Sequence, residues 1–167
     1  LRLPFDAPDA RSLSKKIQEE IYFHALSTSC DLASQHGSHP TFSEPRAAKG
    51  LFQFEAWGVV PEEMTRWNAL RKRIIETGLR NSLLLAIAPT ATIASIVGAY
   101  ECVEPQLSNL FKRETLSGDF LQVNRNLISE LKVLGFWNEE MRNKIKLAEG
   151  SIQAIAEIPT QIKEIYR

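Results

Sequence analysis

The strongest structural pattern in the sequence is Asn81-Ser82-Leu83-Leu84-Leu85-Ala86-Ile87-Ala88-Pro89. Six consecutive apolar residues stand between polar flanks, and a proline closes the run. Successive side chains of a strand point to opposite faces, so a strand that is apolar throughout must be covered on both faces. Leu and Ala also suit a helix, but the shortness of the run and its bounding proline favour a strand. The stretch therefore predicts a doubly buried strand of a parallel sheet or barrel.

Two helical patterns precede this run. The first spans residues 12–35 and is closed by Gly37, and the second begins at Pro61 and is closed by Gly78. The predicted buried stripes are Leu13, Ile17, Ile21, Ala25, Thr28 and Leu32 on the first helix, and Met64, Trp67, Leu70 and Ile74 on the second. Residues 41–50 predict a surface loop. The aromatic residues after this loop are expected to pack: Phe52, Phe54 and Trp57.

Further helices are predicted after the run. One spans residues 124–134 and ends at Gly135, the next is capped by Asn138 and spans about 139–149, and the last is capped by Thr160. Residues 101–120 show no clear pattern. Long helices around a doubly buried strand indicate an α/β architecture. One strand cannot close a sheet, the chain begins without Met, and it ends inside a helical pattern, so we expect strands to be missing at both ends.

The composition excludes several classes of function. The 167 residues include 20 basic and 20 acidic side chains, and 44% of residues are apolar. This composition is that of a globular protein, and zero net charge argues against non-specific binding to nucleic acid or acidic membranes. The longest apolar run is far shorter than the roughly 20 residues that span a bilayer. Two widely separated cysteines, Cys30 and Cys102, predict reduced thiols in the cytoplasm rather than a disulfide framework.

The segment from Pro89 to Ser95 is the best candidate for chemistry. It follows the predicted strand, and ligands of parallel sheets and barrels bind where strands end. Its small residues let a ligand approach the backbone, and Thr90, Thr92 and Ser95 supply hydroxyl groups. A helix starting here would direct free N–H groups toward a phosphate. The alternative is an ordinary strand-to-helix turn with capping threonines, and no Walker-type loop is present.

Other polar clusters carry weaker predictions. Glu101 and Glu104 flank Cys102. The two carboxylates could act in acid–base chemistry or bind a metal, and the Cys102 thiol could be a nucleophile. An exposed carboxylate pair and a small buried cysteine are the favoured interpretations.

The histidines and the main basic cluster are also assigned structural roles. His36 and His39 have metal-ligand spacing, but Gly37 breaks the helix between them, so a solvent loop is favoured. His24 is expected to pack within the first helix. The basic residues 71–73 predict a solvated helix face.

An ordered set of sequence blocks resembles the large, catalytic subunit of class I ribonucleotide reductase. The similarity covers essentially the whole chain. We therefore interpret residues 1–167 as one partial barrel domain that is incomplete at both ends. The blocks are residues 79–84, 88–92, 101–105, 108–111, 116–120, 137–141, 150–153 and 157–159, with 29–33 and 49–50 upstream. Several blocks in one order are far more specific than one short motif.

The resemblance implies a helix-rich fragment of a ten-stranded α/β barrel. It also implies a reductase that converts ribonucleoside diphosphates to 2′-deoxyribonucleoside diphosphates by thiyl-radical chemistry. In that family, the loop matching Thr90, Ala91, Thr92 and Ile93 holds the substrate diphosphate with backbone N–H and hydroxyl groups. Thr92 stands where serine is frequent and keeps the hydroxyl. Many members of the family have a hydroxyl residue at the position of Ile93. Because isoleucine has no hydroxyl group, only the backbone N–H of Ile93 is expected to contribute.

The resemblance places the catalytic residues outside this segment. The thiyl-forming and redox cysteines are expected before Leu1, and the relay tyrosines and C-terminal thiol pair after Arg167. Neither cysteine of this chain matches them, and Tyr22, Tyr100 and Tyr166 do not match the relay. No catalytic residue and no metal site are therefore expected here, and the segment alone is predicted to be inactive.

The implied partners are a ribonucleoside diphosphate, a radical-generating small subunit that carries the metal-radical cofactor, and a second large subunit. ATP and deoxynucleotide effectors would bind upstream, and neither nucleic acid nor membrane is an expected partner. Two alternatives remain. One is a short non-catalytic nucleotide-binding or interaction protein, such as one piece of a split reductase. The other is a cobalamin-dependent reductase with the same barrel.

Overall fold

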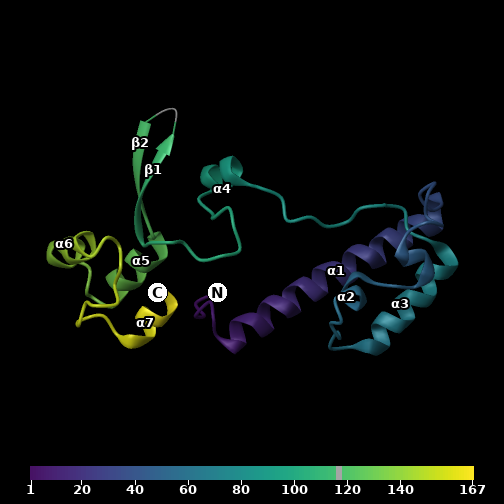
Figure 1. The fold of residues 1–167 in the computed structure, drawn as a ribbon, viewed down its shortest axis with the longest axis horizontal. Helices are drawn as coiled ribbons and strands as arrows, with labels where there is room; N and C mark the ends of the chain where they lie inside the picture. Colours follow the sequence, from purple (N-terminus) through teal and green to yellow (C-terminus); the bar gives the residue numbers. More distant parts are fainter. Residues whose placement is uncertain (116–117) are drawn as a thin grey trace. The chain divides into compact units, whose positions relative to one another are not determined.

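The computed structural model describes residues 1–115 and 118–167, which divide into two compact units. One unit is residues 12–88, and the other combines residues 1–11 with 89–167. Figure 1 labels the elements in chain order. They are α1 (Pro8–His36), η1 (Arg46–Lys49), α2 (Gln53–Ala56), α3 (Met64–Thr77), α4 (Ala91–Val97), β1 (Leu110–Thr115), β2 (Gly118–Val123), α5 (Arg125–Val133), α6 (Glu139–Leu147) and α7 (Thr160–Ile165).

The core of residues 12–88 is built around Trp67, which has no exposed surface. Four aromatic rings surround this indole at centroid distances of 4.8–5.7 Å: Tyr22, Phe23, Phe52 and Phe54. Aromatic pairs in such tilted and edge-on arrangements add specific energy to the burial of area. The predicted packing of Phe52 and Phe54 is thus confirmed. Trp57 is 71% exposed, so its predicted packing is wrong.

Helix α1 extends further than predicted, and its buried face differs from the prediction. Ile17, Ile21 and Leu32 are exposed. The residues of α1 that are buried are Leu26, Ser29, Cys30 and Ala33. Both sets follow helical spacing, and burial is decided by where neighbouring elements contact the helix. Here Leu26 and Cys30 join the Trp67 cluster, together with residues of α3.

Helix α3 follows the prediction closely. It begins at Met64 rather than Pro61, and three of its four predicted stripe positions are buried, with Met64 exposed. Gly78 ends the helix with a φ of 90°, a left-handed value that favours glycine. A Cβ added at Gly78 would lie 2.6 Å from the Cβ of Ser38, so the close approach of this loop to the chain after α1 also requires glycine.

The predicted strand over residues 83–88 is not formed. Leu83 is 89% exposed and Ile87 is 86% exposed, and these residues have no strand pairing. A parallel strand obtains its backbone hydrogen bonds from neighbouring strands, and the described residues provide no neighbour for this one. The pairing in the described chain is confined to a β1–β2 hairpin, so the sheet is not closed into a barrel.

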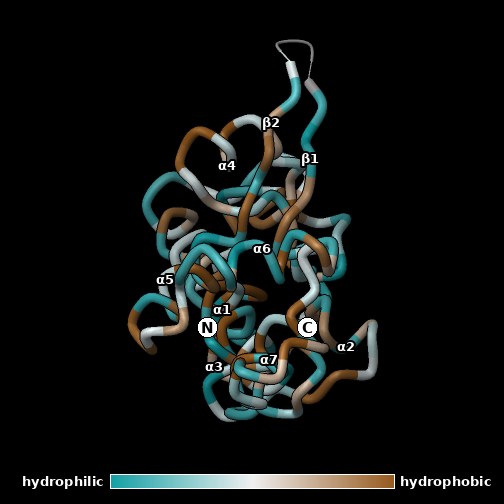
Figure 2. The backbone as a smooth tube through the Cα atoms, turned by 90° about the vertical axis from the view of Figure 1, so that its left-hand side faces the viewer, coloured by the Kyte–Doolittle hydropathy of each residue, from teal (hydrophilic) through white to brown (hydrophobic). Residues whose placement is uncertain are grey.

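The β1–β2 hairpin is not predicted by the sequence pattern, which shows no clear element over residues 101–120. Its antiparallel register pairs Leu110 with Val123 at one end and Arg113 with Phe120 nearer the other. Figure 2 shows that the hairpin is hydrophobic near the Leu110 end and hydrophilic toward the opposite end. The hairpin therefore provides short-range pairing without a continuous apolar face.

The core of the other unit is aliphatic. It buries Leu127, Leu131, Met141, Ile145, Ile152, Ile155, Ile158 and Ile162, which come from α5, α6, α7 and the connecting loop. The predicted cap of α6 is confirmed, because the Asn138 side chain accepts a hydrogen bond from the Met141 N–H. Asn124, predicted as the first residue of its helix, instead caps α5 by accepting hydrogen bonds from the N–H groups of Asn126 and Leu127. Thr160 is the first residue of α7 rather than its cap, and Pro159 holds the cap position.

No helix in residues 1–115 or 118–167 combines the length and apolar character needed to cross a membrane.

Candidate functional site: the turn at residues 90–93

The predicted phosphate-binding residues lie together at the start of α4. Thr90 occupies the N-cap position, and its carbonyl accepts a hydrogen bond of 2.7 Å from the Ala94 N–H. The Thr90 side chain makes no capping hydrogen bond, contrary to the alternative of capping threonines. The first N–H groups of a helix have no intrahelical acceptor, so those of Ala91, Thr92 and Ile93 point out of the helix end. Thr92 and Ile93 are exposed.

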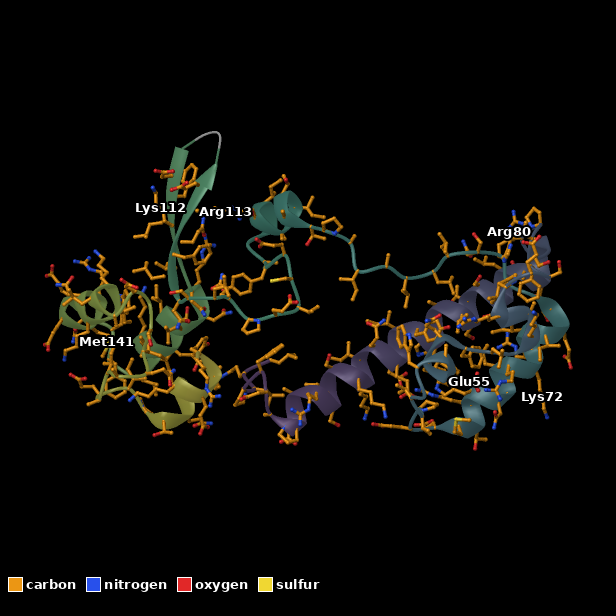
Figure 3. The ribbon with its side chains drawn as sticks, viewed as in Figure 1. Glu55, Lys72, Arg80, Lys112, Arg113 and Met141 are labelled. Atoms are coloured by element: carbon orange, nitrogen blue, oxygen red, sulfur yellow. The ribbon has the colours of Figure 1, made fainter. Side chains whose placement is uncertain are left out.

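The second turn of α4 is bonded to the hairpin. The Ser95 hydroxyl donates to the Ala91 carbonyl at 2.9 Å and accepts from the Arg113 guanidinium at 2.7 Å. Figure 3 shows the Arg113 side chain extending from β1 toward α4. From the sequence, the basic pair at 112–113 is expected to be local and balanced by acidic residues, which gives Arg113 no role in a site. A basic residue in a strand beside a small-residue turn is the signal that could have identified Arg113.

The two basic residues of β1 have different surroundings. Neighbouring side chains of a strand point to opposite faces. The Lys112 ammonium forms ion pairs with Asp119 at 2.8 Å and Glu114 at 3.0 Å, and these hydrogen bonds raise the pKa of Lys112. Arg113 forms no ion pair with any carboxylate in the described part of the chain. The side of the hairpin that meets α4 thus carries an uncompensated positive charge.

The acidic pair near Cys102 is solvent exposed. Glu101, Cys102 and Glu104 lie in an irregular exposed segment, where the Cys102 thiol is 3.5 Å from the Glu104 carbonyl oxygen. The favoured interpretation of Cys102 as a buried residue is therefore wrong. Cys30 is the buried thiol, and burial raises its pKa. Within residues 1–115 and 118–167, no three His, Cys, Asp or Glu side chains are grouped as a metal site would require.

The histidines also depart from their predicted roles. The His24 ring is 72% exposed, so it does not pack in the core, and it lies 3.6 Å from a Glu20 carboxylate oxygen. His36 is exposed, as the loop interpretation predicts, whereas His39 is buried. The His39 Nδ1 lies 3.3 Å from the Thr41 hydroxyl, beside an open hollow of about 290 Å³.

The basic cluster at residues 71–73 is only partly a solvated face. Lys72 is exposed, but the Arg71 guanidinium binds Glu55 at 2.5 Å and stacks over the Phe52 ring. Arg73 forms an ion pair with Asp31 of α1. Both arginines therefore connect α3 to neighbouring elements.

Comparison with known proteins assigns this α/β segment to a family. The family model of the ribonucleotide reductase barrel domain matches residues 1–167. The chain therefore belongs to the barrel-domain family of ribonucleotide reductases.

Several relatives are ribonucleoside-diphosphate reductase large subunits. The chain is 46% identical to the one from Caenorhabditis elegans, and 43% identical to those from Danio rerio and Arabidopsis thaliana. Each similarity covers the entire chain and 20–21% of the relative. The chain thus spans about a fifth of the length of the curated relatives it matches.

Proposed function

We propose that this chain is part of a ribonucleoside-diphosphate reductase large subunit, in which residues 90–93 bind the substrate diphosphate. The observation that carries the proposal is the similarity of the entire chain to large subunits at 43–46% identity. The reaction would reduce ribonucleoside diphosphates to 2′-deoxyribonucleoside diphosphates by thiyl-radical chemistry.

The geometry of the turn supports phosphate binding. The N–H groups of Ala91, Thr92 and Ile93 start a helix, where the backbone carries a partial positive charge. The Thr90 and Thr92 hydroxyls can donate further hydrogen bonds to phosphate oxygens, while Ile93 offers only its N–H. An open, exposed turn leaves room for the diphosphate.

The chemical step would be supplied from outside this segment. The Cys30 thiol is buried in the Trp67 cluster and has a raised pKa, which suits a packing residue rather than a redox residue. We infer that the segment contributes no catalytic cysteine. The complete enzyme would contain further cysteines, effector sites for ATP and deoxynucleotides, and a second large subunit. A separate small subunit would hold the metal-radical cofactor.

Substitutions in the complete reductase test the turn. Thr90→Ala and Thr92→Ala together should raise the KM for a ribonucleoside diphosphate by roughly tenfold or more, since two hydrogen bonds to a charged group are lost. Thr92→Ser keeps the hydroxyl and should behave like the parent. Thr65→Ala, at the exposed start of α3, is the matched control. An unchanged KM in the double variant would contradict the assignment.

The exposed apolar run favours a second candidate, one piece of a split reductase. Leu83 and Ile87 are almost fully exposed, and such a segment requires a covering partner. An immunoblot of source cells distinguishes the two forms. A band several times larger than 18.9 kDa supports the single large subunit, and a band at that size supports the split form.

A further inference from the structure

Helix α4 is attached to its unit by few contacts. Ala94 is its buried residue, and Ile93, Ile96 and Val97 are all exposed. A helix of this length is marginal by itself, because most helical stability comes from packing. The side chains that bond α4 to neighbouring structure therefore have a large influence on its position.

A continuous set of hydrogen bonds connects β1 to the first residue of α4. The Arg113 guanidinium donates to the Ser95 hydroxyl at 2.7 Å, and the same hydroxyl donates to the Ala91 carbonyl at 2.9 Å. A hydrogen bond from a charged donor is stronger than a neutral one. Polarisation of the hydroxyl by the guanidinium also strengthens its bond to Ala91. The hairpin thus holds the turn that carries the N–H groups of residues 91–93.

The charge on Arg113 distinguishes it from its neighbour on β1. Ser95 is the fifth residue of α4, so the guanidinium contacts the second turn of the helix. No carboxylate in the described chain neutralises Arg113, whereas its neighbour Lys112 is paired with Glu114 and Asp119. The hydrogen bond to Ser95 and the positive charge left unpaired in the described chain thus both belong to the Arg113 side chain.

We propose that Arg113 is a positioning residue for the diphosphate turn and acts through Ser95. Its hydrogen bond orients the 91–93 N–H groups before the substrate binds, so its loss should weaken the binding of a phosphorylated substrate and not that of a nucleoside. The inference rests on the proposed function, because the ligand of the turn is the diphosphate assigned there. The guanidinium contacts Ser95 rather than the substrate.

Four variants of the complete reductase test the proposal. Arg113→Met removes the donors and the charge, Ser95→Ala removes the bridging hydroxyl, and the third variant combines both. Lys112→Met is the matched control on the same strand. We expect each single substitution at Arg113 or Ser95 to weaken ribonucleoside diphosphate binding by roughly tenfold, and the combined variant to be no weaker than Arg113→Met. Arg113→Lys should recover most of the affinity.

Two readouts separate positioning from a general structural effect. Binding of the unphosphorylated nucleoside should be unchanged in every variant, and amide hydrogen exchange within α4 should accelerate in Arg113→Met and Ser95→Ala but not in Lys112→Met. Equal loss of nucleoside and diphosphate binding, additive losses in the combined variant, or unchanged α4 exchange would each overturn the proposal. A separate experiment tests the diphosphate assignment itself. If the double variant Thr90→Ala, Thr92→Ala binds the diphosphate as well as the parent does, the assignment of the turn fails, whatever the result for Arg113.

Discussion

Leu79 and Leu83 lie close in the sequence, yet Leu79 is 5% exposed and Leu83 is 89% exposed. Leu79 belongs to the Trp67 cluster, whose buried members come from residues 26–79 and against which Tyr22, Phe23 and Leu84 pack. Leu83 begins the apolar run that ends at Pro89. Both regions are strongly apolar, and the difference between them is the distance along the chain to the residues that would cover them.

The Trp67 cluster is complete because its partners are local. Helices α1, α2 and α3 each contribute apolar side chains, and polar atoms at the border are paired: the Trp67 indole N–H donates to Glu19 at 3.0 Å. A barrel strand instead requires a neighbour on each side and a covering layer. In a chain that spans about a fifth of its relatives, such distant partners are the ones most readily missing.

The largest expected effect is the loss of stability in Trp67→Ala. Replacing a fully buried Trp should lower the free energy of unfolding of residues 12–88 by about 3–5 kcal/mol. Trp57→Ala is the matched control, because Trp57 is exposed and its replacement should change stability by no more than about 0.5 kcal/mol. Chemical denaturation of the chain measures both. Equal losses in the two variants would show that the Trp67 cluster does not stabilise this unit.

The two cysteines provide a second test of the same contrast. Cys30 is 1% exposed within the Trp67 cluster, and burial raises its pKa, whereas Cys102 lies in the exposed segment. A thiol reagent should modify Cys102 at least about a hundredfold faster than Cys30 under native conditions, because Cys30 reacts only after local opening. Both should react alike in denaturant. Cys30→Ser and Cys102→Ser identify the two signals, and similar native rates would contradict the buried assignment.

A third test concerns acid sensitivity at the border of the cluster. Burial raises the pKa of Glu19, but hydrogen bonds from Trp67, the Glu62 N–H and Arg66 outweigh it, so the pKa is lowered overall. A lowered folded-state pKa contributes stability above the unfolded value of about 4.3, and that stability is lost as the pH falls below it.

Glu19→Gln should therefore destabilise the chain by about 1–2 kcal/mol at pH 7, and the difference from the parent should shrink on acidification through about pH 4. Glu63→Gln is the control, since this carboxylate approaches Arg66 at 3.9 Å with a side chain that is 72% exposed. Urea unfolding at several pH values measures the effect. A difference that stays constant with pH would contradict the role of the Glu19 charge.

The sequence predicts local features of this fold better than distant ones. Gly78 and Asn138 end and begin helices as expected, because capping depends on residues within one turn. The buried face of α1 was mispredicted because Ile17 and Leu26 both fit helical spacing, and only tertiary contacts select between them. The β1–β2 hairpin was missed because Lys112 and Arg113 interrupt any alternation of apolar residues.

The candidate site likewise contains one local feature that the sequence predicts and one contact between distant residues that it does not predict. The start of a helix after Thr90 was predictable from small residues and hydroxyls, and the structure places α4 there. The bond from Arg113 to Ser95 was not predictable, because it joins two elements whose pairing depends on the hairpin. Whether the turn binds a diphosphate stays a prediction.

The smallest expected effect belongs to the apolar run itself. Ile87→Ala should change the unfolding free energy of the 167-residue chain by no more than about 0.5 kcal/mol, since Ile87 is 86% exposed. Ile152→Ala, at a position with no exposed surface, is the matched control and should cost about 2–5 kcal/mol. In the complete reductase, Ile87→Ala should become costly as well, because a barrel strand is covered on both faces. The difference in the effect of Ile87→Ala between the 167-residue chain and the complete reductase measures what the rest of the barrel contributes to this strand. An equally small effect in both proteins would mean that residues 83–88 are not a buried barrel strand.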